Sequence, residues 1–330
     1  MKSPEITIIV PIYNGAEYLR ETLDSLLSQS FKDFELLAIN DGSKDKSSDI
    51  VRSFKDDRIR LVEKPNGGLC DALNRGIAEA RTPFIMRNDQ DDLSAPERAE
   101  RQLNVMCKHL NAIALFSFNT KIGNKHRWSN ADKLDMASGE VRVYDPLKDG
   151  CLLGSTMFAR TNALRAAQGF RQAYYPVDDW DLECRLSQAG EVLVLREPLV
   201  AYRFHTDANT YRVFSVMQKK IRWTQDSYVR RLKCSPELSF EAFSTQEPTN
   251  IWLRLERYRS QSSKLHLRIA GQHYLDGRYV GAASRLSAAF LLGPGDVLRR
   301  AMRLLATVRR KIHFFLKKWR KGRQKENPPG

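Results

Sequence analysis

The sequence predicts an α/β fold, in which a doubly wound sheet is followed by a helical C-terminal region. Short apolar runs typical of strands alternate with helical patterns over the first 90 residues. Each of these apolar runs ends in a polar turn. After about residue 212 only helical patterns remain. Strands that alternate with helices indicate a sheet wound by βαβ units, with helices on both faces.

Length and composition set the limits of this interpretation. At 330 residues, with 42% hydrophobic and 28% charged residues, the chain fits one large soluble domain with a helical appendage. Five scattered cysteines without a CxxC motif argue against a disulfide framework or a structural zinc site, and fit a reducing cytosol. The apolar run at residues 6–10 is too short for a signal peptide, and no run of 18 apolar residues predicts a membrane span.

The N-terminal part divides cleanly into strands and helices. Residues 6–11 (ITIIVP) are β-branched, continuous and ended by proline, as in a buried strand. In residues 17–27 leucines recur at helical spacing. By the same criteria we expect a strand at 34–39, a helix at 46–54, a strand at 59–62, a helix at 69–80 and a strand at 84–86.

The remainder is less regular. We expect a helix from Pro96 to Cys107, strands at 112–118, 152–159, 192–195 and 200–204, and a helix at 182–188. Residues 119–150 show no clear pattern. The run 270–294 resembles one tetratricopeptide-like helix pair, which needs another surface to cover its apolar face. We therefore expect a sheet domain at 1–212, a helical region at 213–296 and a basic tail at 297–330.

One acidic stretch stands out, FIMRNDQDDLSAP at residues 84–96. Asp89, Asp91 and Asp92 follow a short apolar strand, and carboxylates this close repel one another unless a cation or water lies between them. Hard oxygen ligands of this kind suit Mg²⁺ or Mn²⁺, which share their coordination with phosphates. The alternative is an acidic turn that caps the helix beginning near Pro96.

Several polar turns follow strands of the predicted sheet. Tyr13, Asp41, the turn at 66–68 and the acids at 89–92 each come directly after a strand. In doubly wound sheets, ligands bind beyond the carboxyl ends of the strands. We therefore expect these four loops to meet in one crevice.

Six ordered motifs resemble those of family-2 glycosyltransferases of the GT-A fold. They are VPIYNG (10–15), NDGS (40–43), NGGLCDALNRGI (66–77), DQDD with PERAERQ (89–102), DDWDLECRL (178–186) and YRFH (202–205). The resemblance covers about the first 210 residues. It implies a GT-A type mixed sheet with a Rossmann-like nucleotide-binding half. It also implies transfer of a sugar from a nucleotide-sugar donor to an acceptor hydroxyl, usually with inversion.

The resemblance assigns a donor-binding set. Tyr13 would lie against the nucleobase, and Asp41 would accept a hydrogen bond from a base N–H; simple loop packing and an Asx turn are the respective alternatives. Gly67 would let the backbone approach the donor. One departure leaves the nucleotide open, because Leu73 stands where many members carry Arg. The whole donor-binding set is Pro11, Tyr13, Asn14, Asp41, Gly67, Asn74 and Asp89.

The resemblance also implies metal and catalytic residues. Asp91 would bind Mg²⁺ or Mn²⁺ directly, Asp89 the ribose or the metal through water, and His205 would be a third ligand, a phosphate contact or merely structural. Asp179 would be the general base, within an Asp178-Asp179 pair where the family has Glu-Asp; the alternative is a helix N-cap. Asp178 and Trp180 would face the acceptor, although Trp180 could equally belong to the core.

The C-terminal tail is strongly basic. Between Arg299 and Lys325 there are twelve basic residues and no acidic one, out of a net charge of +15. Apolar residues recur at three- and four-residue steps from Leu298 to Trp319, which predicts a basic amphipathic helix suited to an anionic bilayer. Nucleic acid is the rival partner for the same charge, and a helix docked on the enzyme is another. Aromatic residues on the apolar stripe favour the membrane.

These observations lead to one interpretation and two alternatives. The leading one is a metal-assisted, inverting glycosyltransferase that acts on a glycan or lipid-linked saccharide. It would be cytoplasmic and peripheral on the inner face of the cell membrane. A nucleotidyltransferase acting on sugar phosphates would carry a Gly-rich basic loop near its N-terminus, which this chain lacks. A non-catalytic nucleotide-sugar or nucleic-acid binding protein is disfavoured by the acids at 89, 91 and 179.

Overall fold

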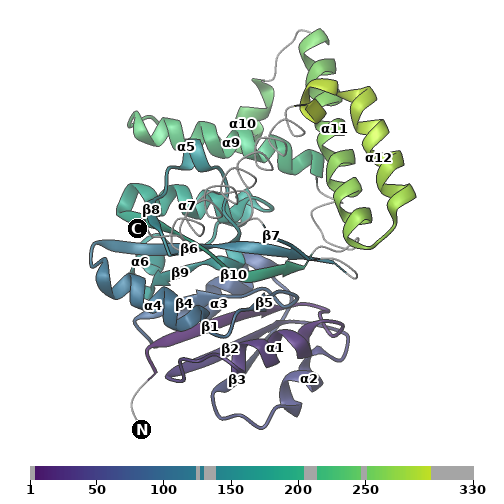
Figure 1. Ribbon diagram of the computed structural model, residues 1–330. Coiled ribbons are helices and arrows are strands. Elements are labelled where there is room, and N and C mark those ends of the chain that lie inside the picture. The colour runs from purple at the N-terminus through teal and green to yellow at the C-terminus, as the bar shows by residue number, and fades with distance from the viewer. Residues whose placement is uncertain (1–3, 124–126, 130–138, 204–213, 247–250, 299–330) are drawn as a thin grey trace, which may run out of the picture. The chain divides into compact units, whose positions relative to one another are not determined.

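The computed structural model describes residues 4–123, 127–129, 139–203, 214–246 and 251–298 (Figure 1). Contacts divide the chain into two compact units, Met1–Ile122 with Ser138–Glu247 and Gly123–Ala137 with Pro248–Gly330. The first unit holds the sheet. It also includes helices α9 (Phe214–Leu232) and α10 (Phe240–Thr245), so this division differs from the boundary predicted at residue 212.

The N-terminal elements follow the predicted order. Their bounds are β1 (Ile6–Ile12), α1 (Leu19–Leu27), β2 (Phe34–Asp41), α2 (Ser47–Ser53), β3 (Ile59–Lys64), α3 (Leu69–Glu79) and β4 (Phe84–Arg87). Seven consecutive residues of β1 are buried, as the continuous apolar run predicts. The prediction works well here because β1 is covered on both faces and its sequence is therefore apolar except for Thr7.

The sheet is mixed and has the strand order β3-β2-β1-β4-β9-β6-β10-β5. β1 pairs in parallel with β2 and β4, and β2 pairs in parallel with β3. β9 (Phe158–Arg160) lies antiparallel between β4 and β6 (Ala112–Ile122). β10 (Glu191–Arg203) is parallel to β6 but antiparallel to β5 (Leu93–Ser94) and β8 (Val141–Val143). The carboxyl ends of the four parallel strands thus share one edge.

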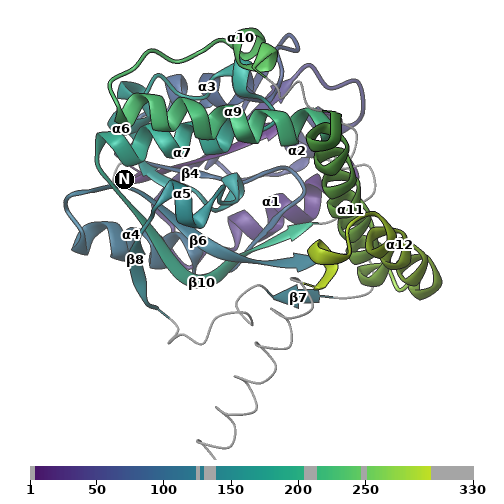
Figure 2. The same cartoon turned by 90° about the horizontal axis from the view of Figure 1, so that it is seen from above.

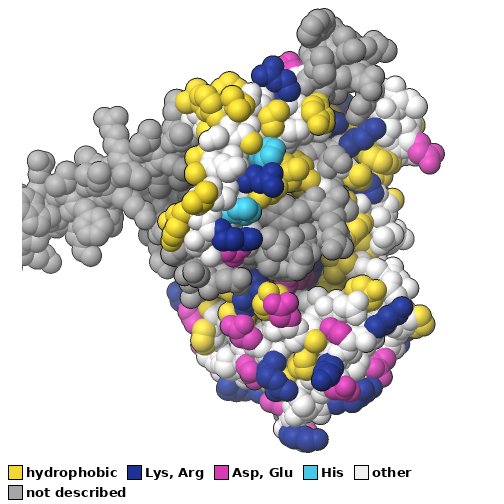
Figure 3. Space-filling view, turned by 90° about the vertical axis from the view of Figure 1, so that its right-hand side faces the viewer, with side chains coloured by type: hydrophobic (Ala, Val, Ile, Leu, Met, Phe, Trp, Pro, Cys, Tyr) yellow, Lys and Arg dark blue, Asp and Glu magenta, His cyan; other side chains and the backbone are white. Residues whose placement is uncertain are grey.

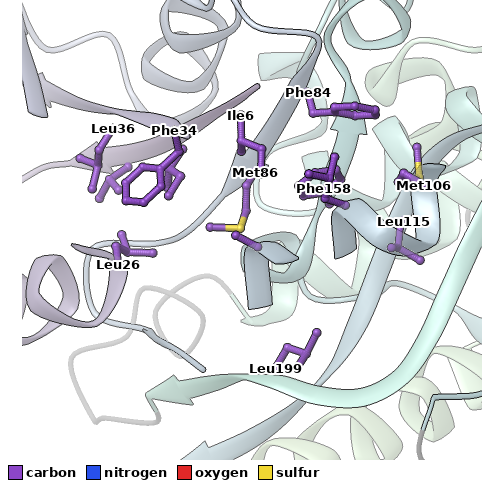
Figure 4. Packing of buried hydrophobic residues seen from close by; sticks show 14 of the residues in the cluster. Ile6, Leu26, Phe34, Leu36, Phe84, Met86, Met106, Leu115, Phe158 and Leu199 are labelled. Carbon is purple, nitrogen blue, oxygen red and sulfur yellow. The ribbon is translucent and has the colours of Figure 1, made fainter. Parts of the chain in front are cut away.

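Helices cover both faces of the sheet (Figure 2). One face packs under α1, α2 and α4 (Arg98–Lys108), and the other under α3, α6 (Thr161–Ala166) and α7 (Asp178–Ala189). Figure 4 shows the first core, where Ile6, Met86 and Phe158 from three strands lie together. On the other face α3 approaches β1 closely at Gly76, where a Cβ would stand 2.6 Å from Ile9 Cγ2. Only glycine permits that approach.

Two predicted strand assignments are wrong. Residues 152–159 do not form one strand, because a 3₁₀ turn, η2 (Gly154–Thr156), precedes the short strand β9. Residues 192–195 and 200–204 belong to one strand, β10, at least as far as the described residues reach. Its pairing with β6 shifts register on both sides of Pro198. Such β-bulges absorb a proline that reads as a strand end in the sequence.

The second unit contains a pair of helices, α11 (Ile251–Leu275) and α12 (Tyr279–Leu292), and the short strand β7 (Arg127–Ser129). The two helices pack together, with the Ser263 hydroxyl donating to the Ala289 carbonyl at 2.9 Å. Figure 3 shows hydrophobic and basic side chains on the exposed surface of this pair. Among the described residues, no helix has both the length and the apolar character needed to cross a bilayer.

Candidate active site

The loops after β1 and β4 are joined through Gln90. Its side-chain oxygen accepts from the Tyr13 amide at 2.8 Å, and its side-chain nitrogen donates to the Tyr13 carbonyl at 3.1 Å. The same side chain fills the space beside Gly15, where a Cβ would come within 2.3 Å of Gln90 Oε1. The acidic loop is therefore fixed to the loop after β1, as the predicted convergence requires.

The β1 loop leaves one aromatic ring at the surface. Tyr13 is 47% exposed, so part of this residue can be reached by a ligand. Asn14 has φ +48° and its side-chain oxygen accepts from the Lys44 amide at 2.8 Å, which ties this loop to the one after β2. Pro11 is buried within β1, in register with Ile39, shortly before this loop begins.

Asp41, at the end of β2, holds the turn at 66–68. One carboxylate oxygen accepts from the Gly67 amide at 2.9 Å and from the Lys64 ammonium. The other accepts from the Gly68 amide at 2.8 Å and from Asn66 Nδ2 at 3.2 Å. Four donors fill the usual acceptor positions of a carboxylate. A hydrogen bond from a nucleobase would have to replace one of them. The contacts do not display the alternative Asx turn of Asp41 either, because the Ser43 amide donates to Asn40 Oδ1 at 3.1 Å.

The three acids of the loop after β4 lie in different environments. Asp89 is 28% exposed and pairs with the buried Arg87 through Nε at 2.9 Å and Nη2 at 3.3 Å. Asp91 is partly exposed. Asp92 is fully buried and accepts from the Arg203 amide at 2.8 Å, while its other oxygen lacks a hydrogen bond. Burial and the charges of Asp91 and Asp89 raise the pKa of Asp92 well above its ordinary value.

The acidic loop rests on a buried arginine from α4. Arg98 donates to Asn88 Oδ1 and Ser94 Oγ at 2.9 Å each and to the Arg87 carbonyl at 2.8 Å. Its Nε donates to the Gln102 side chain at 3.0 Å. Burial lowers the pKa of Arg98 to about 9, so the group stays charged at neutral pH. Sequence reasoning placed this arginine only in the PERAERQ motif and did not assign it this role.

Asp178 and Asp179 lie in the first turn of α7. The N-cap position is Val177, without a side-chain hydrogen bond, so neither acid is the N-cap. The helix begins four residues before the predicted start at Leu182. Acids in the first turn of a helix are stabilised by its dipole. The Asp179 side chain, 26% exposed, pairs with Arg87 Nη1.

The two acids differ in burial. Asp178 is 3% exposed, and one of its oxygens has no hydrogen-bond partner. Burial, followed by the neighbouring charge of Asp179, raises the pKa of Asp178 to about 7, against the opposing charge of Arg87. Asp178 is thus a buried acid beside the site rather than an acceptor-facing carboxylate.

Two predicted site residues have other contacts. Trp180 is 3% exposed and packs with Cys184 and Tyr228 between α7 and α9, so it belongs to the core and offers no face to a sugar. Asn74, on α3, uses its side chain to accept from the Phe170 amide and donate to the Phe170 carbonyl, both at 2.8 Å. Through these two hydrogen bonds Asn74 holds the backbone of Phe170. His205 lies outside the described residues.

Comparison with known sequences assigns the family. Residues 7–167 match Glycosyl transferase family 2. This part of the chain belongs to the family. An uncharacterized glycosyltransferase of Rickettsia typhi is 32% identical over 212 residues, which cover 63% of this chain and 66% of the relative. The hyaluronan synthase of Pasteurella multocida is 24% identical over 225 residues, or 66% of this chain and 22% of the synthase. The chain thus spans two thirds or less of either relative.

Solved structures agree on the GT-A fold. The S. aureus TarS fragment 1–349 in complex with UDP-GlcNAc has a TM-score of 0.54 at 16% identity, covering 86% of this chain and 91% of that one. A mannosyltransferase of Pyrobaculum calidifontis in complex with GDP-Man and Mn²⁺ has a TM-score of 0.55 at 17% identity, covering 94% and 85%. At these identities the likeness concerns the fold.

The family-2 site has hard oxygen donors suited to Mg²⁺ or Mn²⁺. Within the described part of the chain, no cluster of three or more His, Cys, Asp and Glu side chains could hold a metal ion. Two carboxylates and donor phosphates suffice for such ions, which bind few protein ligands. Asp91 and Asp89 fit this requirement in charge and exposure.

Arg87 is the residue that sequence reasoning missed. It is 2% exposed and contacts both Asp89 and Asp179. Asp179 lies 92 positions after Arg87 in the sequence. Burial alone would lower the pKa of its guanidinium, but Asp179 and Asp89 outweigh that effect and raise it. The available signal was a basic residue at the end of an otherwise apolar strand, directly before the acids. Such a buried charge needs acidic partners.

Proposed function

We propose that this chain is a glycosyltransferase that moves a sugar from a nucleoside-diphosphate sugar to an acceptor hydroxyl with inversion. One observation carries the proposal. In a family-2 chain, a partly exposed acid of α7, Asp179, is held by Arg87 beside the acids of the β4 loop at the carboxyl edge of the sheet. This brings a base candidate and a donor-binding candidate together from distant parts of the sequence.

Asp179 is the proposed general base. Its Oδ1 pairs with Arg87, which leaves the second oxygen to accept the proton of the acceptor hydroxyl as that hydroxyl attacks the anomeric carbon. Direct attack by the acceptor is a single displacement and inverts the anomeric centre. Asp178 is too buried for this role. Asp178 is buried and Asp179 is partly exposed, so only Asp179 is proposed to contact the acceptor.

Donor binding is proposed for the loops that Gln90 joins. Tyr13 would stack on the nucleobase, and Asp89 and Asp91 would approach the ribose and diphosphate. A bound Mg²⁺ or Mn²⁺, held by Asp91 with Asp89, would neutralise charge on the leaving diphosphate. One similar structure is a complex with UDP-GlcNAc, and another is a complex with GDP-Man and Mn²⁺. Both support a nucleotide-sugar donor in general.

The acceptor is proposed to be a glycan or lipid-linked saccharide at an anionic membrane surface. The tail sequence with twelve basic residues supports this. The exposed residues of α12 add support, because they include the basic Arg285 and several large apolar side chains. The apolar ones are Tyr279, Val280, Leu286, Phe290 and Leu291, which are 46–86% exposed. Aromatic and aliphatic groups beside basic residues are typical of interfacial helices.

A donor panel tests the proposal. UDP-GlcNAc, UDP-glucose and GDP-mannose are incubated with the protein and Mn²⁺, with EDTA as the metal-free control. We expect slow release of nucleoside diphosphate from one donor, abolished by EDTA. Asp179→Asn should lower transfer to an acceptor by about 10²–10⁴-fold and leave donor binding intact. Release of pyrophosphate would instead indicate a nucleotidyltransferase, and full transfer by Asp179→Asn would exclude this residue as the base.

A further inference from the structure

The guanidinium of Arg87 connects the two sides of the proposed site. Its Nε and Nη2 contact both oxygens of Asp89, at 2.9 and 3.3 Å, and its Nη1 contacts Asp179 Oδ1. A guanidinium presents its donors in one rigid plane, so the two carboxylates are held in a fixed relation to each other. A lysine at the same position has all its donors on one ammonium nitrogen, so it could not hold the two carboxylates in this planar arrangement.

The arginine is itself held on several sides. Its amide donates to the Met157 carbonyl at 3.1 Å, and its carbonyl accepts from Arg98 Nη2 at 2.8 Å. The guanidinium carbon lies 5.4 Å from the centre of the Phe170 ring. The backbone of Phe170 is fixed by the Asn74 side chain. The side chain of Arg87 therefore has little freedom to move when a ligand arrives.

Gly154, in η2, has no side chain, and Arg87 and Asp179 occupy the space where its side chain would stand. A Cβ at this position would stand 2.3 Å from Arg87 Nη1 and 2.6 Å from Asp179 Oδ2. Its φ does not lie in the range restricted to glycine, so an alanine would strain no backbone there. The three atoms nearest to such a Cβ all belong to this pair.

We infer that Arg87 is a positioning residue, which sets the base Asp179 relative to the donor-side Asp89, and that Gly154 is the residue that makes their contact possible. The inference rests on the proposed role of Asp179 as base. It adds a specific requirement, because a single methyl group at residue 154 would displace the base without removing any functional group.

Kinetics of Gly154→Ala test this inference, with Gly271→Ala as the matched control. A Cβ at Gly271 meets nothing within 4 Å, so the same chemical change there disturbs nothing. We expect Gly154→Ala to lower kcat about 10²-fold, as for a misplaced catalytic group, with the donor KM changed less than about threefold. In an Asp179→Asn background the same change should lower kcat by about threefold at most. An equal fall in both backgrounds would overturn the inference.

A second measurement needs no substrate. Urea unfolding is followed for Arg87→Met, Asp179→Asn and the double variant. If the two side chains stabilise each other, the midpoint of the double variant should be no lower than that of the weaker single variant. Additive losses would mean that the pair does not position anything. Full turnover by Asp179→Asn would remove the proposed base, and this cycle would still decide whether Arg87 fixes its neighbours. Arg87→Lys should fail to restore kcat, whereas restoration would show that charge alone suffices.

Discussion

Acids that adjoin in the sequence differ sharply in this site. Asp91 and Asp179 are partly exposed, whereas their neighbours Asp92 and Asp178 are buried, each with an oxygen that lacks a hydrogen bond. Burial disfavours the charged form of an acid. The exposed member of each pair is therefore the one suited to a ligand. Burial raises the pKa of the other member and so favours its neutral form.

Asp178 should make stability depend on pH. Its pKa in the folded protein is about 7 against an ordinary value of 3.8, so the folded state binds the extra proton between these values. The free energy of unfolding should then fall as pH rises from about 4 to about 7, by at most about 4 kcal/mol. Asp178→Asn cannot titrate and should lose this dependence. Thermal unfolding at pH 5 and pH 8 measures it, and an unchanged slope in the variant would contradict the assignment.

At the scale of elements, α4 supports the acidic loop. The N-terminal turn of α4 contributes Arg98, whose hydrogen bonds fix Asn88, Ser94 and the carbonyl of Arg87. Loops are otherwise the mobile parts of a fold. The hydrogen bonds from Arg98 on α4 restrain this loop more than contacts within the loop alone would. The acids of the loop are thus presented on a rigid base.

Arg98→Ala should unfold the protein more easily. Removal of the guanidinium takes a charged donor from four buried oxygen atoms, of which Asn88 Oδ1 keeps the Ser94 hydroxyl as a donor. We expect this loss to cost about 3–5 kcal/mol. The matched control is Lys108→Ala, an exposed residue of the same helix, for which we expect a change under about 0.5 kcal/mol. Urea unfolding of both variants gives the comparison. Equal stabilities would mean that Arg98 does not carry the loop.

The sequence predicts most of the N-terminal sheet because β1, β2 and β4 are buried along almost their whole length. Runs such as residues 6–12 are almost wholly apolar, with Thr7 as their one polar residue, and can be recognised without any partner. β10 was divided in two because its register shifts around Pro198 are visible only through its pairing with β6. Arg87 and Gly154 were missed for a related reason, since their role consists of contacts with Asp179, which the chain alone does not reveal.

At the scale of the whole molecule, charge is distributed unevenly. The tail carries twelve of the basic residues and lies outside the described part of the chain, so its predicted helix stays a prediction. All the proposed site residues that the structure describes lie in the first unit. Membrane binding and donor chemistry should therefore be separable.

Truncation after Asp296 tests that separation. We expect the shortened protein to lose binding to vesicles rich in anionic lipid, because each basic residue near such a surface contributes about 1 kcal/mol. Donor hydrolysis should persist. Co-sedimentation with anionic and with neutral vesicles at increasing salt gives the readout, and the full chain should bind the neutral ones poorly. Intact vesicle binding after truncation, or a preference of the full chain for RNA in competition, would contradict the membrane proposal.

The turn held by Asp41 also bears on how the protein ages. Asn66 precedes Gly67, the pair most prone to deamidation, in which the glycine nitrogen attacks the asparagine side chain. Here that nitrogen donates to Asp41 Oδ1 at 2.9 Å, and the Asn66 amide donates to the Asp41 carbonyl at 3.0 Å. Both reacting groups are thus occupied while the chain is folded. Chemical damage at this turn should accumulate in unfolded material and spare the native enzyme, so the modified fraction in a stored sample would record how often this edge of the sheet has opened.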